Sequence, residues 1–361
     1  MINPSLSLGD LRRYAVARSL FTPTRLPQAI RKLGFVQADP IRAPARAQDL
    51  TLRHRVIDYR AGDLERRYDR LEIEEDFFVN YGFLPRSTHA LMHPRSPRAV
   101  WPAARWTQAH AVLEFVRERG VVHPREVDSH FAHGKVTNWF GGTSNASTQL
   151  LDGMHYRGLV RIARREAGVR LYAAQAEHDQ VADAGAALDA LVDVVVGKYA
   201  PLPERSLSEL VSYLRHGAPQ WADDRRAALA RAKLRLPSAK VAGLTWYWPA
   251  GENPKAKRHA TQDKVRLLAP FDPVAWDRRR FEIFWGWAYR FEAYTPAPKR
   301  VRGYYALPLL WRDDVIGWAN LNLDDGRLHS DIGFVNKRPR ERAFNVALED
   351  ELSAMAQFLG V

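Results

Sequence analysis

The sequence contains no cysteine, and this absence excludes several kinds of chemistry at once. Disulfide bonds, cysteine nucleophiles and thiolate metal sites are all ruled out. Long apolar runs are missing as well, since no stretch approaches the roughly 20 residues that a membrane helix needs. The first residues, MINPSLSLGDLRRY, lack the charged and then apolar regions of a secretory signal. We therefore expect a cytoplasmic protein without membrane contact.

Acidic residues are few relative to basic ones. Lys plus Arg number 54 against 41 for Asp plus Glu, which gives a formal net charge of +13. With 46% apolar residues the chain can still bury a core, so the excess of positive charge indicates a folded protein with a polyanionic partner, nucleic acid first. The alternative is an Arg-rich composition without a functional cause, and the distribution of the basic residues has to decide between them.

The periodicity of apolar residues predicts an α+β fold of tandem winged helix-turn-helix units followed by a small C-terminal antiparallel β-barrel. At 361 residues we expect several domains. Their predicted bounds are 1–100 for an N-terminal winged-helix-like unit, 101–180 for a central winged helix, 181–250 for a third winged-helix-like unit, and 260–361 for the β-barrel with a closing helix.

The central unit has the clearest pattern. Predicted helices at 106–120, from 123 onward and at 145–158 precede two alternating runs at 159–174 that read as a hairpin. In a winged helix the third helix usually enters the major groove and the hairpin contacts the backbone. Basic residues gather there, so we expect contacts to DNA from Arg157, Arg161, Arg164 and Arg165, and from Asn145 unless it only caps its helix.

A polar pair near the N-terminus lies in the segment 34–39, GFVQAD. Gln37 and Asp39 are two residues apart in an extended segment, so their side chains project from the same side. Pro40 prevents a helix from continuing through Asp39. From spacing alone the pair is most often a polar strand end with Asp39 capping a turn. The alternative is a water-positioning amide beside an acid/base carboxylate.

Other basic and polar residues are candidates for DNA contact. Those that follow the polar pair could bind phosphates or line a pocket, although a solvated helix face is an equal alternative: Arg42, Arg46, Gln48, Arg53, His54 and Arg55. Lys299 and Arg300 could bind phosphate or pair with acidic neighbours. His130 and His133 alone make a weak metal pattern, so we expect neither a metal nor a cofactor.

The polar pair, the central unit and the run LLAPFDPVAWDRRRFEIFWGWAYRFEAYTPAPKRVRGYYALPLL together resemble the AlkZ/YcaQ-like winged-helix DNA glycosylases. The motif of that family is Gln, an apolar residue, and then Gln or Asp. Here it reads Gln37-Ala38-Asp39, which is similar to the YcaQ-like branch. One departure is the segment 80–82, NYG, where many members of the branch carry a His-Glu-Ala type segment.

The resemblance implies a monofunctional DNA glycosylase that hydrolyses the N-glycosidic bond of N7-alkylated guanine and unhooks interstrand crosslinks. Asp39 would stabilise the oxocarbenium-like transition state or act as general base, and Gln37 would position water. Lys32 is the only lysine near the motif in sequence, so no Schiff base is expected. The implied partner is double-stranded DNA with alkylated bases or crosslinks, bound by a monomer that joins the nucleoid.

A second hypothesis is a non-enzymatic winged-helix transcription regulator. Such a protein would need basic, base-reading helices but would have no use for a carboxylate and an amide beside a pocket.

Overall fold

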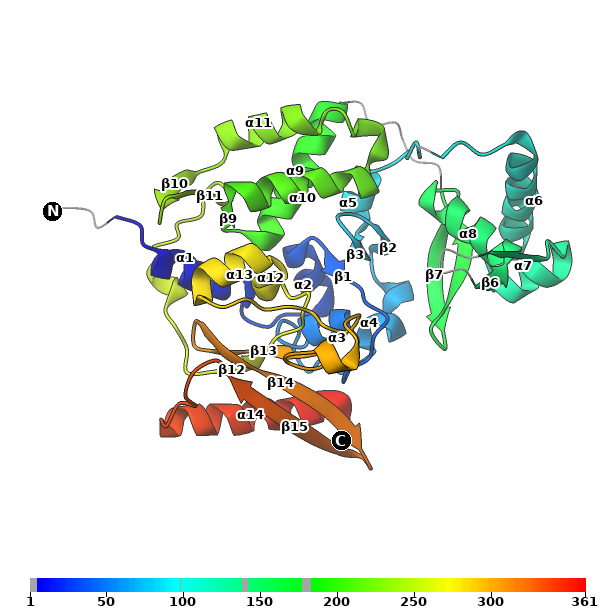
Figure 1. Ribbon diagram of the computed structural model, residues 1–361. Helices are drawn as coiled ribbons and strands as arrows, with labels where there is room; N and C mark the ends of the chain where they lie inside the picture. The colour runs from blue at the N-terminus through cyan, green and yellow to red at the C-terminus, as the bar shows by residue number, and fades with distance from the viewer. Residues whose placement is uncertain (1–4, 98, 138–141, 177–182) are drawn as a thin grey trace. The chain divides into compact units, whose positions relative to one another are not determined.

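The computed structural model describes residues 5–97, 99–137, 142–176 and 183–361 (Figure 1). The chain divides into two compact units that are each discontinuous in sequence. Unit 1 comprises Met1–Leu64, Val192–Ser212 and Leu229–Val361, and unit 2 comprises Glu65–Leu191 and Tyr213–Ala228. Within the described ranges no helix is long and apolar enough to cross a membrane.

Unit 1 mixes short helices with two small sheets. Its elements are α1 (Leu8–Ser19), α2 (Leu26–Leu33), β1 (Val36–Gln37), α3 (Ala47–Leu52), β9 (Leu202–Pro203), β10 (Ser238–Val241), β11 (Leu244–Tyr247), η3 (Lys257–His259), β12 (Val265–Leu267), α12 (Pro273–Trp276), α13 (Arg278–Trp285), η4 (Ala297–Lys299), β13 (Leu307–Trp311), β14 (Asp314–Asp324), β15 (Arg327–Phe334) and α14 (Arg342–Leu359).

The end of α2 places the polar pair. Gly34 closes this helix at φ +68, a left-handed conformation that a residue with a side chain rarely adopts. A Cβ at this position would also lie 2.8 Å from the Val194 side chain. The chain therefore turns sharply at Gly34 and enters β1 with Phe35 and Val36 fully buried.

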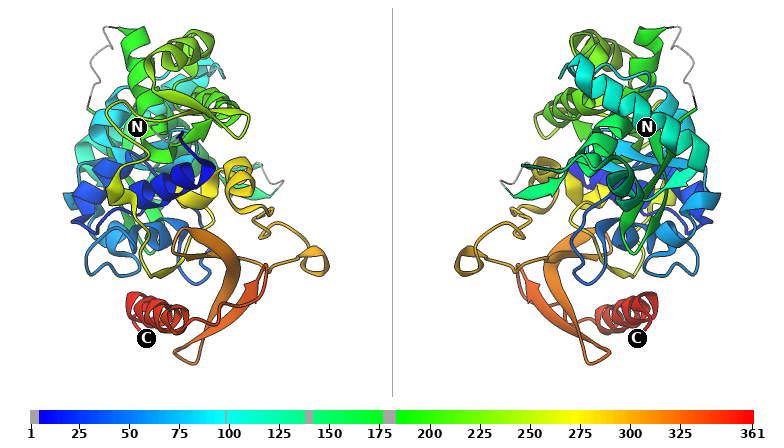
Figure 2. Two further views of the ribbon diagram at one scale, coloured as in Figure 1. Left: turned by 90° about the vertical axis from the view of Figure 1, so that its left-hand side faces the viewer. Right: turned by 90° about the vertical axis from the view of Figure 1, so that its right-hand side faces the viewer.

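The C-terminal sheet is open, which corrects the predicted barrel. Its order is β12-β13-β14-β15, all antiparallel. A barrel would require the two outer strands to pair, and in the part of the chain that the structure describes β12 pairs only with β13 and β15 only with β14. Figure 2 shows α14 (red) beside the curved sheet. The ring centroids of Phe344 on α14 and Trp311 on β13 lie 5.5 Å apart.

The region 260–361, predicted as a β-barrel with one closing helix, also contains α12 and α13, which is a second correction. Asp272 and Asp277 act as N-caps: their carboxylates accept from Val274 N and from Arg279 N and Arg280 N, respectively. These caps satisfy backbone donors that a helix start otherwise leaves unpaired. Capping and tertiary packing thus outweigh the β-propensity of the aromatic residues in α13.

Unit 2 contains helices and the antiparallel strand pairs β2–β3, β5–β6 and β7–β8. Its elements are η1 (Tyr68–Arg70), β2 (Ile73–Phe77), β3 (Tyr81–Pro85), α5 (Arg86–Ala90), α6 (Ala103–Arg119), β4 (Val121–Val122), α7 (Pro124–Phe131), β5 (Lys135–Thr137), β6 (Thr143–Asn145), α8 (Ala146–Tyr156), β7 (Val160–Glu166), β8 (Val169–Ala174) and η2 (Pro219–Trp221).

The predicted hairpin at 159–174 is confirmed. Strands β7 and β8 pair antiparallel around a turn in which Ala167 and Gly168 have φ of 48 and 85. The predicted helices at 106–120 and 145–158 correspond to α6 and α8.

Four helices are divided between the two units: α4 (Asp63–Arg66), α9 (Ala184–Tyr199), α10 (Glu204–Gly217) and α11 (Arg225–Arg235). They include the helices assigned to a third winged-helix-like unit. The described chain is thus a mixture of helix and sheet, and the division into four consecutive domains stays a prediction.

Candidate functional site

Gln37 lies at the end of β1 and is only 6% exposed. Its Oε1 accepts a hydrogen bond of 2.8 Å from the indole Nε1 of Trp276. Because this bond uses the carbonyl end of the amide, it fixes the side chain and directs the amide nitrogen elsewhere. Within the described ranges no protein acceptor contacts that nitrogen, so it is open to water or a ligand.

Asp39 follows two residues later and is 9% exposed. Its Oδ1 accepts from Ile41 N at 2.8 Å across Pro40, which is the turn cap expected from sequence. Its backbone N donates to Gln48 Oε1 at 3.3 Å. Burial raises the pKa of the Asp39 carboxyl, since few donors offset the loss of water. The carboxylate is thus held in place through one oxygen, and its burial makes it more basic than an exposed aspartate.

The charge of Asp39 acts on two tyrosines in the loop between α13 and β13. Burial and then the Asp39 carboxylate raise the pKa values of Tyr294 and Tyr305. Tyr294 is 78% exposed, whereas Tyr305 is 3% exposed. The buried Tyr305 hydroxyl meets no hydrogen-bond partner among the residues described. A polar hydroxyl left unpaired in the interior is costly, and it is typical of a site that binds water or substrate.

Lys198 approaches the same segment, which sequence proximity did not indicate. Its Nζ donates to the Phe35 carbonyl oxygen, and the side chain is buried. Burial, together with the charge of Arg55, lowers the pKa of Lys198 to about 7. The two contacting residues are 163 positions apart, so no local signal could reveal the contact.

Comparison with known proteins identifies the family. A family model described as DNA glycosylase AlkZ-like matches residues 30–358. The chain belongs to the AlkZ-like DNA glycosylase family. It is therefore a DNA glycosylase, a hydrolase of DNA repair. Among solved structures, Streptomyces sahachiroi DNA glycosylase AlkZ is similar in fold, with a TM-score of 0.61 at 15% identity over 99% of this chain and 98% of that one.

The basic segment after the polar pair turns mostly inward in the glycosylase. Arg55 is fully buried, and its guanidinium binds both oxygens of Asp272 at 2.8 and 3.0 Å. Arg53 pairs with Glu351 at 2.7 Å, and His54 Nε2 lies 3.0 Å from Leu267 O. These three positions therefore hold unit 1 together. Arg42 is exposed and Arg46 half-buried, so both remain candidates for DNA contact.

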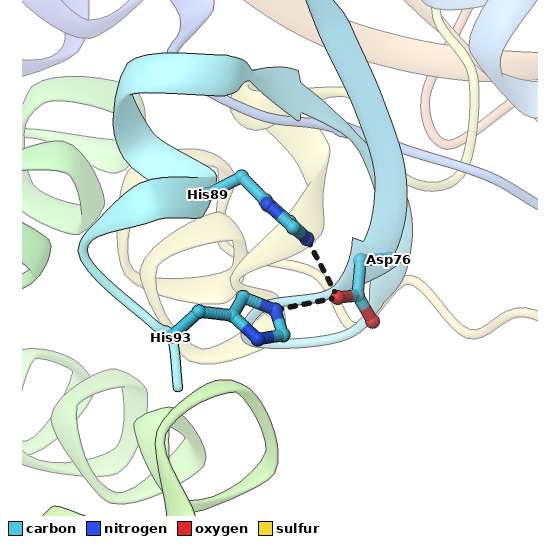
Figure 3. A group of neighbouring side chains, drawn as sticks. All are labelled: Asp76, His89 and His93. Atoms are coloured by element: carbon cyan, nitrogen blue, oxygen red, sulfur yellow. Dashed lines mark hydrogen bonds and ion pairs between the residues drawn. The ribbon is translucent and has the colours of Figure 1, made fainter. Parts of the chain in front are cut away.

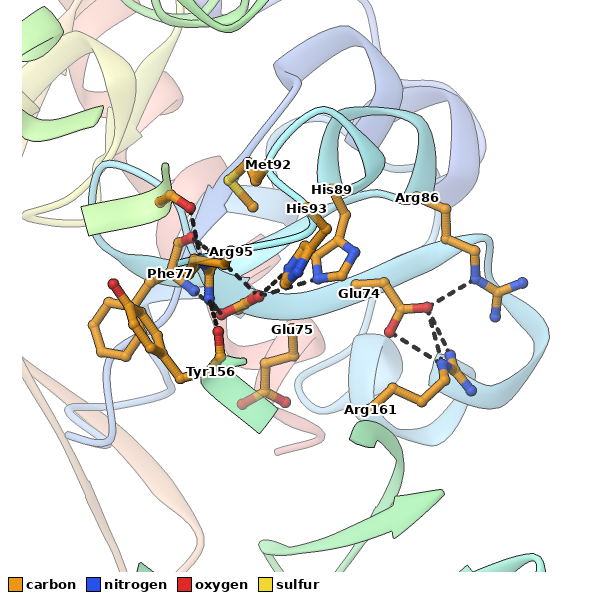
Figure 4. A network of polar contacts seen from close by, with 12 residues as sticks. Glu74, Glu75, Phe77, Arg86, His89, Met92, His93, Arg95, Tyr156 and Arg161 are labelled. Carbon is orange, nitrogen blue, oxygen red and sulfur yellow. Dashed lines mark hydrogen bonds and ion pairs between the residues drawn. The ribbon is translucent and has the colours of Figure 1, made fainter. Parts of the chain in front are cut away.

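The arginines of β7 alternate between ion pairs and solvent. Arg161 binds Glu74 at 2.9 Å, and Figure 4 shows this carboxylate shared with Arg86. Arg165 pairs with the fully buried Glu75. Arg164 is exposed and pairs only with neighbouring Glu166. Of the three, Arg164 is the one placed for DNA contact without loss of an ion pair to a buried carboxylate.

The remaining predicted contacts also have internal partners. Asn145 donates to Asp128 Oδ2 at 2.9 Å and does not cap α8 through its side chain. Arg157 donates to Ala99 O at 2.7 Å and lies over the Trp101 ring. Lys299 is exposed, while Arg300 donates to Thr295 O at 2.8 Å. Lys299 is the most available of these side chains.

A buried Asp-His-His cluster in unit 2 was not expected from sequence. Potential ligand atoms of Asp76, His89 and His93 lie within 4.8 Å of one another (Figure 3). The spacing could suit a metal, but the Arg95 guanidinium already binds both Asp76 oxygens at 3.2 and 3.1 Å (Figure 4). A cation beside this guanidinium would be repelled. These side chains are better explained as a hydrogen-bonded cluster around the Asp76 carboxylate. In the sequence, the two histidines are four residues apart, one on α5 and one just after it, but nothing there shows that Asp76 on β2 lies beside them.

The buried His93 predicts acid sensitivity. Burial lowers its pKa from 6.5 to about 3. In the unfolded chain His93 takes up a proton near pH 6.5, whereas in the folded chain it stays neutral at that pH. The free energy of unfolding therefore keeps its full value above pH 6.5 and decreases below it. We expect the loss from His93 to be about 1.4 kcal/mol per pH unit. Urea unfolding at pH 7.5 and 5.5 measures it.

Variants assign that pH dependence. The His93→Gln variant should show a weaker loss of stability between the two pH values, while exposed His110→Gln should behave like wild type. Equal stability of the wild type at both pH values would contradict the lowered His93 pKa.

Proposed function

We propose that the glycosylase is monofunctional and hydrolyses the N-glycosidic bond of N7-alkylated guanine, including guanines joined in interstrand crosslinks. Gln37 and Asp39 are the proposed catalytic residues. The observation that carries this assignment is their joint burial at and just after the end of β1. Each is fixed through one oxygen, and its other polar atom has no hydrogen-bond partner among the described residues. A merely structural strand end would not need both groups to be held in this way.

The proposed chemistry follows from charge. Loss of an N7-alkylated guanine leaves an oxocarbenium-like sugar, and a buried carboxylate stabilises that charge more strongly than one in water. The raised pKa of Asp39 also makes it a better acceptor of a proton from the attacking water. The Gln37 amide nitrogen donates to this water and orients it. The leaving base is already cationic, so no separate acid is required.

Release of a free base is the deciding experiment. Wild-type protein is incubated with duplex DNA containing N7-methylguanine, and in parallel with a nitrogen-mustard crosslinked duplex. We expect free modified base from the first and strand separation from the second. Binding of both duplexes without base release would favour the second hypothesis, a winged-helix regulator that only binds DNA.

The proposed DNA contact includes unit 2. We propose that the order α6-β4-α7-α8-β7-β8 in unit 2 forms a winged helix, supported by the three helices followed by an antiparallel hairpin. The excess positive charge of the chain supports double-stranded DNA as the partner of a monomer.

No covalent intermediate is expected with DNA. A Schiff base would require a lysine nitrogen to reach the sugar carbon, and the Lys198 Nζ is buried against Phe35 O. Borohydride added during turnover should therefore trap no protein–DNA adduct. An adduct that forms in the wild type and in Lys32→Met but disappears in Lys198→Met would instead reveal a lyase that uses Lys198.

Tyr305→Phe should separate rate from stability. The Tyr305 hydroxyl has no partner within the described chain, so its removal costs no internal hydrogen bond and the melting temperature should not fall. If this hydroxyl donates to bound water or sugar, base release should slow by about tenfold. The measurement is single-turnover base release together with thermal unfolding.

The matched control is Tyr289→Phe. The buried Tyr289 hydroxyl donates to Ala306 O at 2.7 Å, so this variant should lose about 1 kcal/mol of stability and keep its rate. Equal rates in wild type and Tyr305→Phe would remove Tyr305 from the site.

A further inference from the structure

Unit 1 contains a cavity of about 450 Å³ that is lined by neither Gln37 nor Asp39. One wall is apolar and comes from the end of α1 and the residues after it, including Val16, Leu20 and Phe21. The opposite wall is formed by residues 258–266, which lead into β12. The volume lies in the range of small-molecule sites, which are typically about 300–1,000 Å³.

Charged side chains of the lining are mostly cationic. The lining holds six arginines and lysines and two carboxylates: Arg13, Arg53, Arg258, Lys264, Arg266 and Arg312, with Asp313 and Glu351. Three of the cations are already paired, Arg13 with Asp10, Arg53 with Glu351, and Arg312 with Asp263. The remaining three give the cavity its unbalanced positive charge.

Arg266 is the most informative of these three. It is half-buried on β12, and its only described polar contact is a long one of 3.5 Å to Gln262 Oε1. No carboxylate lies within 4.0 Å of it among the described residues. Burial lowers the pKa of Arg266, and the carboxylate of Glu351 offsets part of this shift. A guanidinium removed from water without an anion is costly, and buried charges are normally paired.

Two exposed cations, Arg258 and Lys264, add to the unbalanced positive charge of the lining. Neither Arg258 nor Lys264 has a carboxylate within 4.0 Å among the described residues, although the charge of Arg258 helps to lower the pKa of Glu252. The side chain of Arg258 donates to His259 Nε2 at 3.4 Å. His54 adds no charge, because burial and the neighbouring Arg53 lower its pKa well below the usual range. The charge of the lining therefore matches an anion with several acceptor oxygens.

We propose that this cavity binds a phosphate ester through Arg266, Arg258 and Lys264, with its sugar or base against the apolar wall. Arginine recognises phosphate through two parallel N–H bonds, and lysine supplies a further charge. The phosphate belongs either to a DNA strand outside the damaged base or to a free nucleotide. The site is separate from the proposed catalytic pair and does not depend on the glycosylase reaction.

The first arm of the test uses inorganic phosphate and deoxyadenosine monophosphate as probes. Both should raise the melting temperature of the full-length wild type above that in chloride of equal ionic strength. In Arg266→Gln the affinity for the nucleotide, measured by calorimetry, should fall at least about tenfold. Arg342→Gln is the control, since this exposed arginine of unit 1 does not line the cavity.

The second arm measures affinity for undamaged duplex DNA against salt. Loss of one phosphate contact in Arg266→Gln should reduce the slope of log affinity against log salt by about 0.9, which assigns the phosphate to DNA. An unchanged slope with lost nucleotide binding assigns it to a free nucleotide. The double variant Arg258→Ala/Lys264→Ala repeats both arms with exposed residues, in case Arg266→Gln fails to fold.

The proposal is overturned if neither probe protects the wild type beyond chloride and no variant changes the salt slope. The assays contain no damaged base, so this result would leave the proposed glycosylase chemistry untouched. Conversely, a failure of the wild type to release a damaged base would not affect the proposal of a phosphate site.

Discussion

Asp39→Asn is expected to reduce the rate of base release by about 10²- to 10⁴-fold. The substitution keeps an oxygen that can accept from Ile41 N, so the turn across Pro40 should survive. It removes the negative charge that faces the developing oxocarbenium ion. Because burial raises the pKa of Asp39, its charge costs stability at neutral pH, and the variant should melt at or above the wild-type temperature. Single-turnover kinetics and thermal unfolding measure the two effects.

The pH profile and a matched control complete this prediction. Wild-type rate should fall in acid as Asp39 takes up a proton, at a pH above the ordinary carboxyl value because its pKa is raised. Asp58→Asn makes the same chemical change at an exposed position of unit 1 and should leave the rate unchanged. Gln37→Ala should slow base release without changing the pH at which the rate falls in acid. Full activity in Asp39→Asn would remove the proposed site.

Asp76→Ala should cause the largest loss of stability among single substitutions considered for unit 2, about 3–5 kcal/mol. The side chain of Arg95 is fully buried, and Asp76 neutralises it through two hydrogen bonds. Its removal leaves a buried guanidinium without a counter-charge and takes an acceptor from His89. The free energy of unfolding in urea at pH 7 gives the effect directly.

Glu114→Ala provides the comparison within the same unit. Glu114 pairs with Arg117 one turn away at 2.7 Å, and both side chains are at least half exposed. Removal of that pair should cost less than about 0.5 kcal/mol. If Asp76→Ala cost as little, the cluster would not be a stabilising centre, and binding of Zn²⁺ by the wild type would then have to be tested.

The elements predicted with success are those whose signals are local. The β7–β8 hairpin follows from alternation around Ala167 and Gly168, and both residues adopt the positive φ that such a turn requires. The extended conformation expected for Gln37 is confirmed, because Gln37 ends β1. Each of these features depends on a few consecutive residues.

The misjudged features depend on contacts between distant segments. Whether outer strands close a barrel is decided by edge pairing, which alternation along one strand does not report. The basic character of Arg55 suggested phosphate binding, yet Asp272, 217 positions away, holds its charge in the interior. The indole of Trp276 orients Gln37 although the two residues are 239 positions apart, and no local pattern indicates this contact. The sequence shows which residues are charged or aromatic, but the fold decides which side chains they contact.

The passage of the chain between its two units has a consequence for synthesis on the ribosome. The chain crosses between units at four points, after residues 64, 191, 212 and 228. Every segment of unit 2 is therefore made before the last 133 residues, which all belong to unit 1. The Ala61 N–H donates to Phe358 O, and Arg53 pairs with Glu351, so the segment bearing Gln37 and Asp39 waits for α14 to complete its unit. The proposed catalytic pair is thus made before unit 2, whereas its own unit is completed only after unit 2.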